Sequence, residues 1–138
     1  NKTKGVKVVA EALAGKTGKA KLIITPDSHN HRLSIGESEK DGEMVKIISF
    51  SDLRKQQNLK QVDLLKMDIE GGEYDVLENL SETDWKHIKN IILEYHEDHV
   101  HSPKDLERIV RENGFSAQIF PSKFDKRMGF LFAHNKKI

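Results

Sequence analysis

Two apolar runs, at residues 62–67 and 88–93, constrain the fold of this chain more than any other feature of its sequence. Strands covered on one face alternate apolar and polar residues, whereas continuous apolar runs are typical of strands covered on both faces of a parallel sheet. Between the two runs, residues 73–80 carry apolar side chains at helical spacing. A strand, a helix and a strand in this order predict a parallel strand pair with a right-handed crossover, and therefore an α/β fold.

Several other segments carry start and stop signals of regular structure. Ser102 and Asp105 have the spacing of a capping box, Pro103 stands at the first helical position and Gly114 follows the last turn, which together predict a helix. A second cap at residues 81–84 predicts a short helical turn. The remaining expected elements are a helix at 51–57, strands at 6–9, 20–25 and 44–48, and a closing antiparallel hairpin formed by 115–120 and 128–133.

The length of the chain, 138 residues, predicts a single domain over residues 1–138, because domains typically contain about 100–200 residues. Within it, residues 26–43 contain only Leu33 and Ile35 as large apolar residues. We interpret this segment as a polar loop or lid, since it has too few apolar side chains to add much to a core. The expected fold class is α/β, with mostly parallel strands and an antiparallel hairpin at the end.

The composition excludes several classes of protein. The chain has no cysteine, which excludes disulfides, cysteine-ligated zinc or iron–sulfur sites and a thiol nucleophile. Its net charge is only +1, and no apolar run approaches the ~20 residues that cross a bilayer. We therefore expect no nucleic-acid partner, no membrane partner and a cytoplasmic location. Residues 51–102 contain twelve acidic and six basic residues, which favours a cationic ligand in this part of the chain.

The candidate catalytic residues follow the two apolar runs. Lys66, Asp68 and Glu70 alternate at the end of the first run, and Glu94 and His96 alternate at the end of the second. If the two strands are neighbours about 4.8 Å apart, these side chains meet at the edge of the sheet where ligands bind in α/β folds. A lysine within an apolar strand also needs a counter-ion, for which Asp68 and Glu94 are the candidates.

Two simpler interpretations of these residues stay open. Lys66 and the acids form a structural ion pair, because buried pairs perturb pKa values without any catalysis. Alternatively, the histidines and carboxylates of residues 94–101 (EYHEDHVH) bind a divalent metal. Their spacing matches no specific metal motif, so no metal ligand is assigned. The Gly71-Gly72 pair next to Asp68 lets a ligand approach the backbone and favours a functional site.

Residues 62–80 (VDLLKMDIEGGEYDVLENL) resemble the signature segment of the FkbM family of S-adenosylmethionine-dependent methyltransferases. In that family an apolar strand leads into Lys, Asp, Glu, Gly and Glu at the same spacing, followed by a helix. Residues 6–24 and 91–97 are similar to the family's third and fifth strands. The resemblance implies a Rossmann-like methyltransferase sheet with a closing antiparallel pair, and S-adenosylmethionine as the cofactor.

The resemblance also implies roles for particular residues. Glu11 and Ala12 would border the adenine of the cofactor, and Asp68 would lie near its methionine end. Methyl transfer is an in-line displacement at a sulfonium, so the protein aligns the acceptor and, for a hydroxyl group, removes its proton. The expected acceptor is a small molecule or a sugar-like compound. The base is expected among four residues at the strand ends: Asp68, Glu70, Glu94 and His96.

One part of the family's pattern has no counterpart in this chain. The glycine-rich cofactor loop after the first strand and the acidic residue after the second are missing, and the sequence starts just before the third strand. We therefore interpret the chain as the C-terminal portion of such an enzyme, and residues 1–138 as an incomplete domain. On its own it is expected to bind the cofactor weakly or not at all, and to self-associate through an exposed sheet edge.

Two other functions stay open at this point. The sequence Asp68-Ile69-Glu70-Gly71 after an apolar strand is similar to the nucleophile loop of haloacid-dehalogenase-like phosphatases. Asp68 would then accept a phosphoryl group with the help of Mg²⁺. The second acid is Glu rather than Asp and the motif lies in the middle of the chain, which disfavours this function. The other alternative is a non-catalytic half-domain that serves as a binding module.

Overall fold

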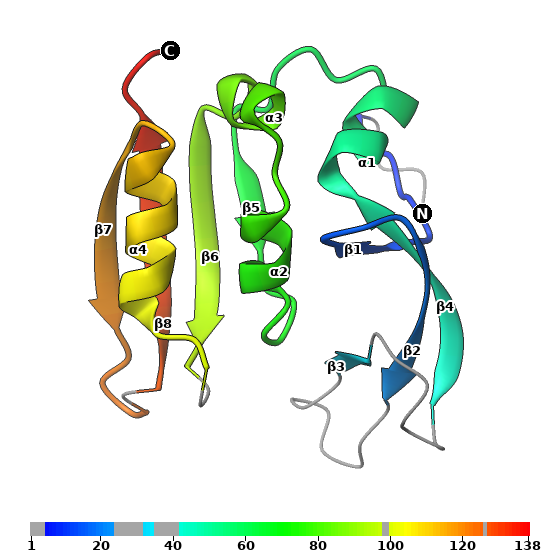
Figure 1. Ribbon diagram of the computed structural model, residues 1–138, viewed down its shortest axis with the longest axis horizontal. Helices are drawn as coiled ribbons and strands as arrows, with labels where there is room; N and C mark the ends of the chain where they lie inside the picture. The colour runs from blue at the N-terminus through cyan, green and yellow to red at the C-terminus, as the bar shows by residue number, and fades with distance from the viewer. Residues whose placement is uncertain (1–4, 24–31, 35–41, 98–99, 126) are drawn as a thin grey trace.

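The structure of the protein is a computed structural model that describes residues 5–23, 32–34, 42–97, 100–125 and 127–138. Its elements form two four-stranded sheets, which lie beside each other in Figure 1. The strands are β1 (Ala12–Ala14), β2 (Gly18–Ile23), β3 (Arg32–Ser34), β4 (Glu43–Ser49), β5 (Leu65–Met67), β6 (Asn90–His96), β7 (Phe115–Pro121) and β8 (Met128–Asn135). The helices are α1 (Phe50–Gln56), α2 (Glu73–Glu78), α3 (Glu82–His87) and α4 (Pro103–Glu112).

The arrangement of the strands differs from the one mostly parallel sheet that the sequence predicts. One sheet has the order β1-β4-β2-β3 and the other has the order β5-β6-β8-β7. Among the described strands, the β1–β4 and β5–β6 pairs are parallel and the other four pairs are antiparallel. The α/β class and the closing β7–β8 hairpin are confirmed. The expectation of mostly parallel strands was wrong, because the connections from β2 to β3 and from β7 to β8 are too short for a helical crossover.

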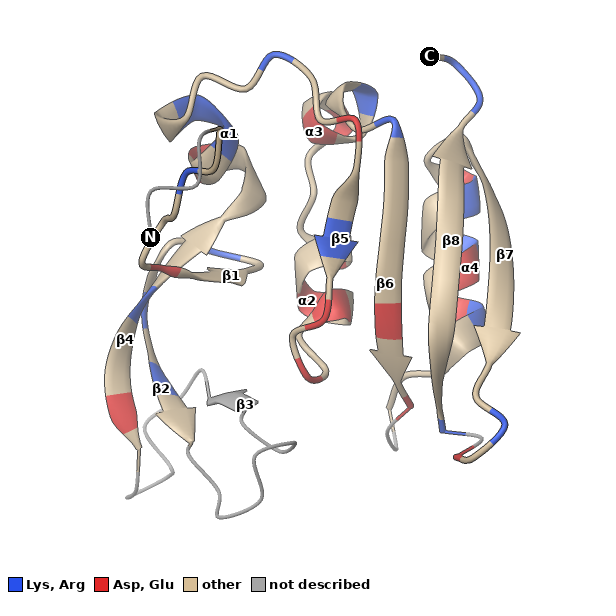
Figure 2. Ribbon diagram, turned by 180° about the vertical axis from the view of Figure 1, so that it is seen from behind, with Lys and Arg blue, Asp and Glu red and all other residues tan. Residues whose placement is uncertain are grey.

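The β5-β6-β8-β7 sheet is covered by helices on one face, and no described element covers the other face, which Figure 2 shows from the front. Along β6, buried Ile91, Leu93 and Tyr95 alternate with half-buried residues. On β8, Phe130 and Phe132 point to the open face and are 47% and 40% exposed. The expectation that these strands are covered on both faces was therefore wrong within the described part of the chain.

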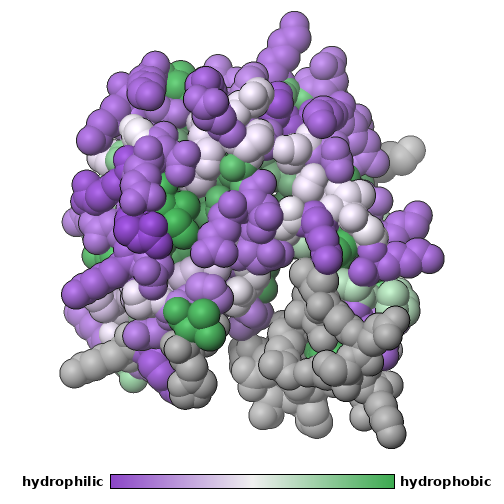
Figure 3. Space-filling model, in the orientation of Figure 1, coloured by the Kyte–Doolittle hydropathy of each residue, from purple (hydrophilic) through white to green (hydrophobic). Residues whose placement is uncertain are grey.

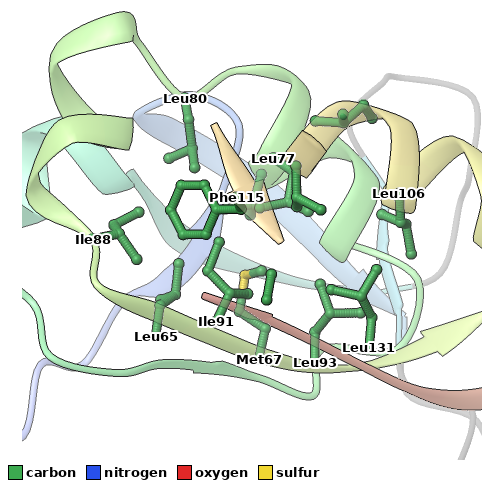
Figure 4. Packing of buried hydrophobic residues seen from close by; sticks show 14 of the residues in the cluster. Leu65, Met67, Leu77, Leu80, Ile88, Ile91, Leu93, Leu106, Phe115 and Leu131 are labelled. Carbon is green, nitrogen blue, oxygen red and sulfur yellow. The ribbon is translucent and has the colours of Figure 1, made fainter. Parts of the chain in front are cut away.

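The main core lies between this sheet and α2, α3 and α4. Figure 4 shows how side chains of the strands meet those of the helices: Leu65, Ile91, Leu93 and Leu131 from the sheet, and Leu77 and Leu106 from α2 and α4. Burying one such side chain contributes about 1.5–3 kcal/mol, so this layer fixes the positions of β5 and β6. The helix side of the molecule presents a mostly hydrophilic surface, as amphipathic helices require (Figure 3).

The predicted helix starts are confirmed. Ser81 forms a capping box with Asp84 at the start of α3, and Ser102 forms one with Asp105 at the start of α4. Pro103 is the first residue of α4. The expected helix at 51–57 corresponds to α1. These positions follow from local hydrogen bonds between residues three apart, which is why the sequence locates them closely.

Two expectations for the N-terminal part need correction. Residues 6–9, expected as a strand, lie in neither a helix nor a strand; β1 begins only at Ala12 and pairs with β4. Residues 26–43, expected as a polar loop or lid, contain β3 and the first residue of β4; apart from these and Gly42, the segment lies outside the described residues. None of the helices described here is long and apolar enough to cross a membrane.

Candidate active site

The residues predicted as a site lie where β5 and β6 end. These strands are parallel neighbours, and their last pair in register is Met67 with Leu93. The next residue of each segment is acidic, so Asp68 and Glu94 lie at the same end of the sheet. Figure 2 shows acidic residues in the loop after β5, on α2 and on β6. Four residues at this end of the sheet, Asp68, Glu70, Glu94 and His96, form what we call the β5–β6 corner.

The closest contact in the β5–β6 corner joins His96 and Glu70. Nε2 of His96 lies 3.5 Å from Oε2 of Glu70, and both side chains are at least half-buried. Nδ1 of His96 is buried and has no hydrogen-bond partner among the described residues. Glu70 and His96, which lie near the ends of different strands in the sequence, are therefore in contact in the structure, with the imidazole beside the carboxylate.

Lys66 and Asp68 form a second pair in the same region. Nζ of Lys66 lies 3.3 Å from Oδ2 of Asp68, and the two side chains are 63% and 42% exposed. Asp68 is therefore the counter-ion of Lys66, as expected, but the expected burial of the lysine was wrong, because Lys66 alternates with buried Leu65 and Met67 and points to the open face. An exposed pair of this kind contributes about 0–1 kcal/mol, so it binds Asp68 only weakly.

Glu94 shares the open face with His96. Both side chains are half-buried and alternate with the buried residues of β6. Two residues along a strand span about 7 Å, so the two side chains are neighbours on this face. Across the sheet, Glu94 is in register with Phe130 of β8. The β5–β6 corner is therefore bounded by acidic groups on the β5 side and by an aromatic side chain on the β8 side.

Glu73 is not among the predicted site residues, yet it organises the loop of the β5–β6 corner. It is the first residue of α2, and its side chain is completely buried. Its Oε1 accepts a hydrogen bond from the N–H of Ile69 at 2.8 Å, and its Oε2 accepts one from the N–H of Gly71 at 2.9 Å. Burial raises the pKa of Glu73 above its usual value, although the backbone hydrogen bonds and the nearby His96 act in the opposite direction.

The metal interpretation of residues 94–101 gains no support from the described residues. His101 stacks on Tyr74 of α2, with ring centroids 4.4 Å apart. Asp98 and His99 lie outside the described residues. In the rest of the described chain, no three His, Asp or Glu side chains are grouped as ligands of a metal ion.

A pocket of about 410 Å³ lies between the N-terminal segment, β1 and α1. Its walls are largely apolar, and they include Val9, Leu13 and Leu53. Oε2 of Glu11 and Oε1 of Gln57 are buried there, without a hydrogen-bond partner in the described part of the chain. The volume falls in the range of about 300–1,000 Å³ that is typical of small-molecule sites. Two unsatisfied acceptors suit a ligand that donates N–H groups.

The structure separates the two residues that were predicted to border the adenine. Glu11 lines the pocket, whereas Ala12 lies in β1, pairs with Ile47 of β4 and is not one of the lining residues. Gln57 was not predicted, because its place in the pocket depends on how α1 packs against the N-terminal segment. Glu73 was missed for a similar reason, although an acid directly after Gly-Gly at a helix start was a visible signal.

Two polar contacts join the region of β1 and α1 to the helices α2 and α3. The N–H of Gly15, directly after β1, donates a hydrogen bond of 2.7 Å to Oδ2 of Asp75 on α2. Nε of Arg54 on α1 donates one of 3.1 Å to Oδ1 of Asp84 on α3. A methyl group on Gly15 would lie only 2.7 Å from the carbonyl oxygen of Asp75, so the close approach requires glycine.

Known proteins that are similar to the chain agree with the resemblance of residues 62–80. The family model "Methyltransferase FkbM domain" matches residues 3–117. Methyltransferase sdnD of Sordaria araneosa is 33% identical over 66 residues, which cover 48% of this chain and 25% of that protein. Methyltransferase 1 of Beauveria bassiana (strain ARSEF 2860) is 36% identical over 80 residues, which cover 57% of this chain and 30% of that protein. No solved structure matches the chain.

The family match includes every residue of the site as the structure describes it. Residues 3–117 contain the pocket residues Glu11 and Gln57, the β5–β6 corner, and Glu73. The matches to the two curated relatives span 25% and 30% of their lengths. Because the family model matches most of the sequence, the chain belongs to the FkbM methyltransferase family.

Proposed function

We propose that the protein is an S-adenosylmethionine-dependent methyltransferase that methylates a hydroxyl group of a small-molecule or sugar-like acceptor. The observation that carries the proposal is the contact between His96 and Glu70, 3.5 Å apart at the end of two parallel strands. Ligands bind at this edge of α/β sheets. Membership of the FkbM family supports methyl transfer as the reaction. We also propose that the β5-β6-β8-β7 sheet is one end of a Rossmann-like methyltransferase sheet.

The β5–β6 corner suits the positively charged end of this cofactor. Three carboxylates, those of Asp68, Glu70 and Glu94, belong to the corner, and the one lysine described there, Lys66, is 63% exposed. Negative charges favour a bound cation, and they do so more strongly where water is partly excluded. We assign Asp68 to the methionine end of the cofactor, as the family resemblance implies.

The pocket at Glu11 suits the base of the same cofactor. An adenine has flat apolar faces and an exocyclic amino group that donates hydrogen bonds. The buried acceptors Oε2 of Glu11 and Oε1 of Gln57 would receive such bonds, and Val9 and Leu13 would contact the ring. Ala12, which follows Glu11 directly, stays a predicted neighbour of the base.

The residues of the β5–β6 corner account for the proton that leaves a hydroxyl acceptor. When bound, S-adenosylmethionine supplies a methyl group on a positively charged sulfur. The imidazole of His96 would accept the hydroxyl proton of an acceptor that takes this methyl group. The carboxylate of Glu70 stabilises the imidazolium that forms, as a carboxylate does beside other catalytic histidines. Glu94 is left as an acceptor for a further hydrogen bond from the substrate.

Calorimetric titration of the full-length natural protein with S-adenosylhomocysteine tests this function. A parallel assay measures Mg²⁺-dependent hydrolysis of p-nitrophenyl phosphate, because the phosphatase alternative uses Asp68 as a nucleophile. We expect binding of the thioether and no hydrolysis. Hydrolysis that disappears in Asp68→Asn, without binding of the thioether, would instead establish the phosphatase. Absence of both binding and hydrolysis would leave the binding-module alternative.

A pair of variants tests the assignment of the base pocket. Glu11→Gln removes a charged acceptor from the pocket, and we expect it to weaken binding of S-adenosylhomocysteine about tenfold, or about 1.4 kcal/mol. Glu78→Gln is the matched control, because Glu78 is an exposed acid on α2. Equal affinities of the two variants would show that Glu11 does not contact the cofactor.

A further inference from the structure

The loop between β5 and α2 holds Glu70 in an uncommon backbone conformation. Glu70 has a φ of 53° and Gly71 has a φ of 93°, both in the left-handed region. Glycine adopts this region freely, whereas a residue with a Cβ atom rarely does so. Glu70 therefore needs an external contact to keep this conformation, in which its carboxylate lies 3.5 Å from the imidazole of His96.

Glu73 provides that contact. Its two carboxylate oxygens accept hydrogen bonds from the N–H groups of Ile69 and Gly71, the residues on either side of Glu70. An ionised carboxylate accepts such bonds on both oxygens at once, and charge-assisted hydrogen bonds are the stronger class. Because the Glu73 side chain is completely buried, water does not compete for either oxygen.

We infer that Glu73 is a positioning residue of the β5–β6 corner: its buried carboxylate holds the N–H groups of the residues before and after Glu70 and so fixes the Glu70 carboxylate beside His96. The kinetic part of this inference rests on the proposed function, because it takes the His96–Glu70 pair to accept the substrate proton. Its structural part, the coupling of Glu73 to His96 through Glu70, is independent of any reaction.

Nuclear magnetic resonance of the His96 imidazole in the full-length natural protein tests the structural part. We expect Glu70→Gln to change the ¹⁵N chemical shifts of the ring, and Glu73→Gln to change them in the same direction, since an amide has only one acceptor oxygen for the two N–H groups. The double variant should match Glu70→Gln alone. Changes that add in the double variant, or an unchanged ring in Glu73→Gln, would overturn the inference.

Turnover and substrate affinity in the same variants test the kinetic part. Glu73→Gln should lower kcat at least about tenfold and change KM for the cofactor much less, because Glu70 is the partner of the proposed base and only one of three carboxylates at the corner. In a Glu70→Ala background, Glu73→Gln should have little further effect. Glu73→Asp keeps the charge but shortens the side chain by one methylene group. It should also lower kcat, because the shorter side chain cannot keep both hydrogen bonds, to Ile69 and to Gly71. Glu78→Gln on the same helix is the control and should leave kcat unchanged.

The two sets of measurements separate the possible failures. Coupling of the imidazole signals without any methyl transfer would support the positioning role of Glu73 and contradict the proposed function. Methyl transfer in which Glu73→Gln and Glu70→Ala act additively would support the function and overturn the positioning role. If Glu73→Gln fails to fold, the same comparison of kcat and ring signals is made with Glu73→Asp.

Discussion

At the residue scale, the two ring nitrogens of His96 have different surroundings. Nε2 faces Glu70 at 3.5 Å, and Nδ1 has no partner among the described residues. The contact with Glu70 places the imidazole at the edge of the sheet where ligands bind. Its neighbour Glu94 lies two residues earlier on the same face of β6.

Replacing His96 tests its role as the base. We predict that His96→Ala in the full-length natural protein lowers turnover at least about tenfold, because general base catalysis contributes about 10²–10⁴-fold. Affinity for S-adenosylhomocysteine should change little, since the imidazole acts on the acceptor. His87→Ala serves as the control, because His87 lies before the opposite end of β6. Unchanged turnover in His96→Ala would exclude His96 as the base.

Asp84 is the buried acid that joins α3 to α1. Its carboxylate accepts hydrogen bonds from the hydroxyls of Ser51 and Ser81 and from Nε of Arg54. Burial alone would raise the pKa of Asp84, but these hydrogen bonds together outweigh it and hold the pKa below its usual value. We predict that Asp84→Asn lowers the free energy of unfolding by about 3 kcal/mol, because Arg54 loses its counter-ion.

The pH dependence of this effect has a definite sign. A carboxyl with a lowered folded pKa stabilises the protein fully above its unfolded pKa and loses that contribution as the pH falls through the folded pKa. Urea unfolding at a series of acidic pH values should therefore show a shallower loss of stability in Asp84→Asn than in the natural protein. Glu82→Gln, an exposed acid on the same helix, should change the stability by less than about 0.5 kcal/mol. Identical acid profiles of the natural protein and Asp84→Asn would contradict the assignment.

At the scale of elements, the β5-β6-β8-β7 sheet has one face packed against helices and one open face. Consecutive residues of β8 illustrate the difference: Leu131 is completely buried, whereas Phe132 is 40% exposed. Phe132 lies in register with Ile92 of β6 on the open face. The two faces should therefore respond very differently to truncation of their side chains.

We predict that Leu131→Ala lowers the free energy of unfolding by about 2–5 kcal/mol, because it leaves a cavity in the core. Phe132→Thr should cost less than about 1 kcal/mol, which is the scale of a cross-strand pair on an exposed face. Chemical denaturation of both variants measures the difference. A cost for Phe132→Thr as large as that for Leu131→Ala would mean that the open face is covered in solution.

The helices of this chain could be predicted from the sequence more closely than its strand pairing. Caps such as Ser81 with Asp84 and Ser102 with Asp105 act between residues three apart, so the sequence alone locates α3 and α4. Strand pairing depends on residues far apart in the chain. Residues 6–9 have the composition of a strand, yet the pairing with β4 begins at Ala12 because register is a tertiary property.

The site could be predicted only in part, because some of its residues follow from local sequence patterns and others depend on tertiary packing. Alternation along β5 and β6 indicated Asp68, Glu70, Glu94 and His96, and the parallel register brings their segments to one end of the sheet. The position of Glu73 could not be read from the sequence, because it depends on the path of the loop from Ile69 to Gly72. The partners of Glu11 likewise depend on the packing of α1.

At the scale of the whole molecule, the two sheets end in open edges. Among the described strands, β5 pairs only with β6, and β1 pairs only with β4. No strand in the described part of the chain pairs with the other edge of β5, which lies next to Leu64 with an exposure of 54%. Edges of this kind favour pairing with another chain.

We predict that the 138-residue chain self-associates through this edge. Sedimentation equilibrium should show a concentration-dependent increase in mass, and Leu64→Lys should weaken the association at least about tenfold, because a charge at an edge opposes pairing. Met44→Lys is the control, since Met44 has a similar exposure of 55% on the other sheet. A monomer at all concentrations, or equal effects of both lysines, would contradict this role of the edge.

Residue-resolved magnetic resonance during titration of the full-length natural protein with S-adenosylhomocysteine is the most direct test of where the methyl donor binds. The predicted result is that the amide signal of Gly71, the ring signals of His96 and the amide signal of Glu11 move with one common dissociation constant, while the indole signal of Trp85, a buried residue of α3, does not. Saturable binding that leaves Gly71 and His96 unmoved, or no response anywhere in the protein, would show that the β5–β6 corner is not the site of methyl transfer.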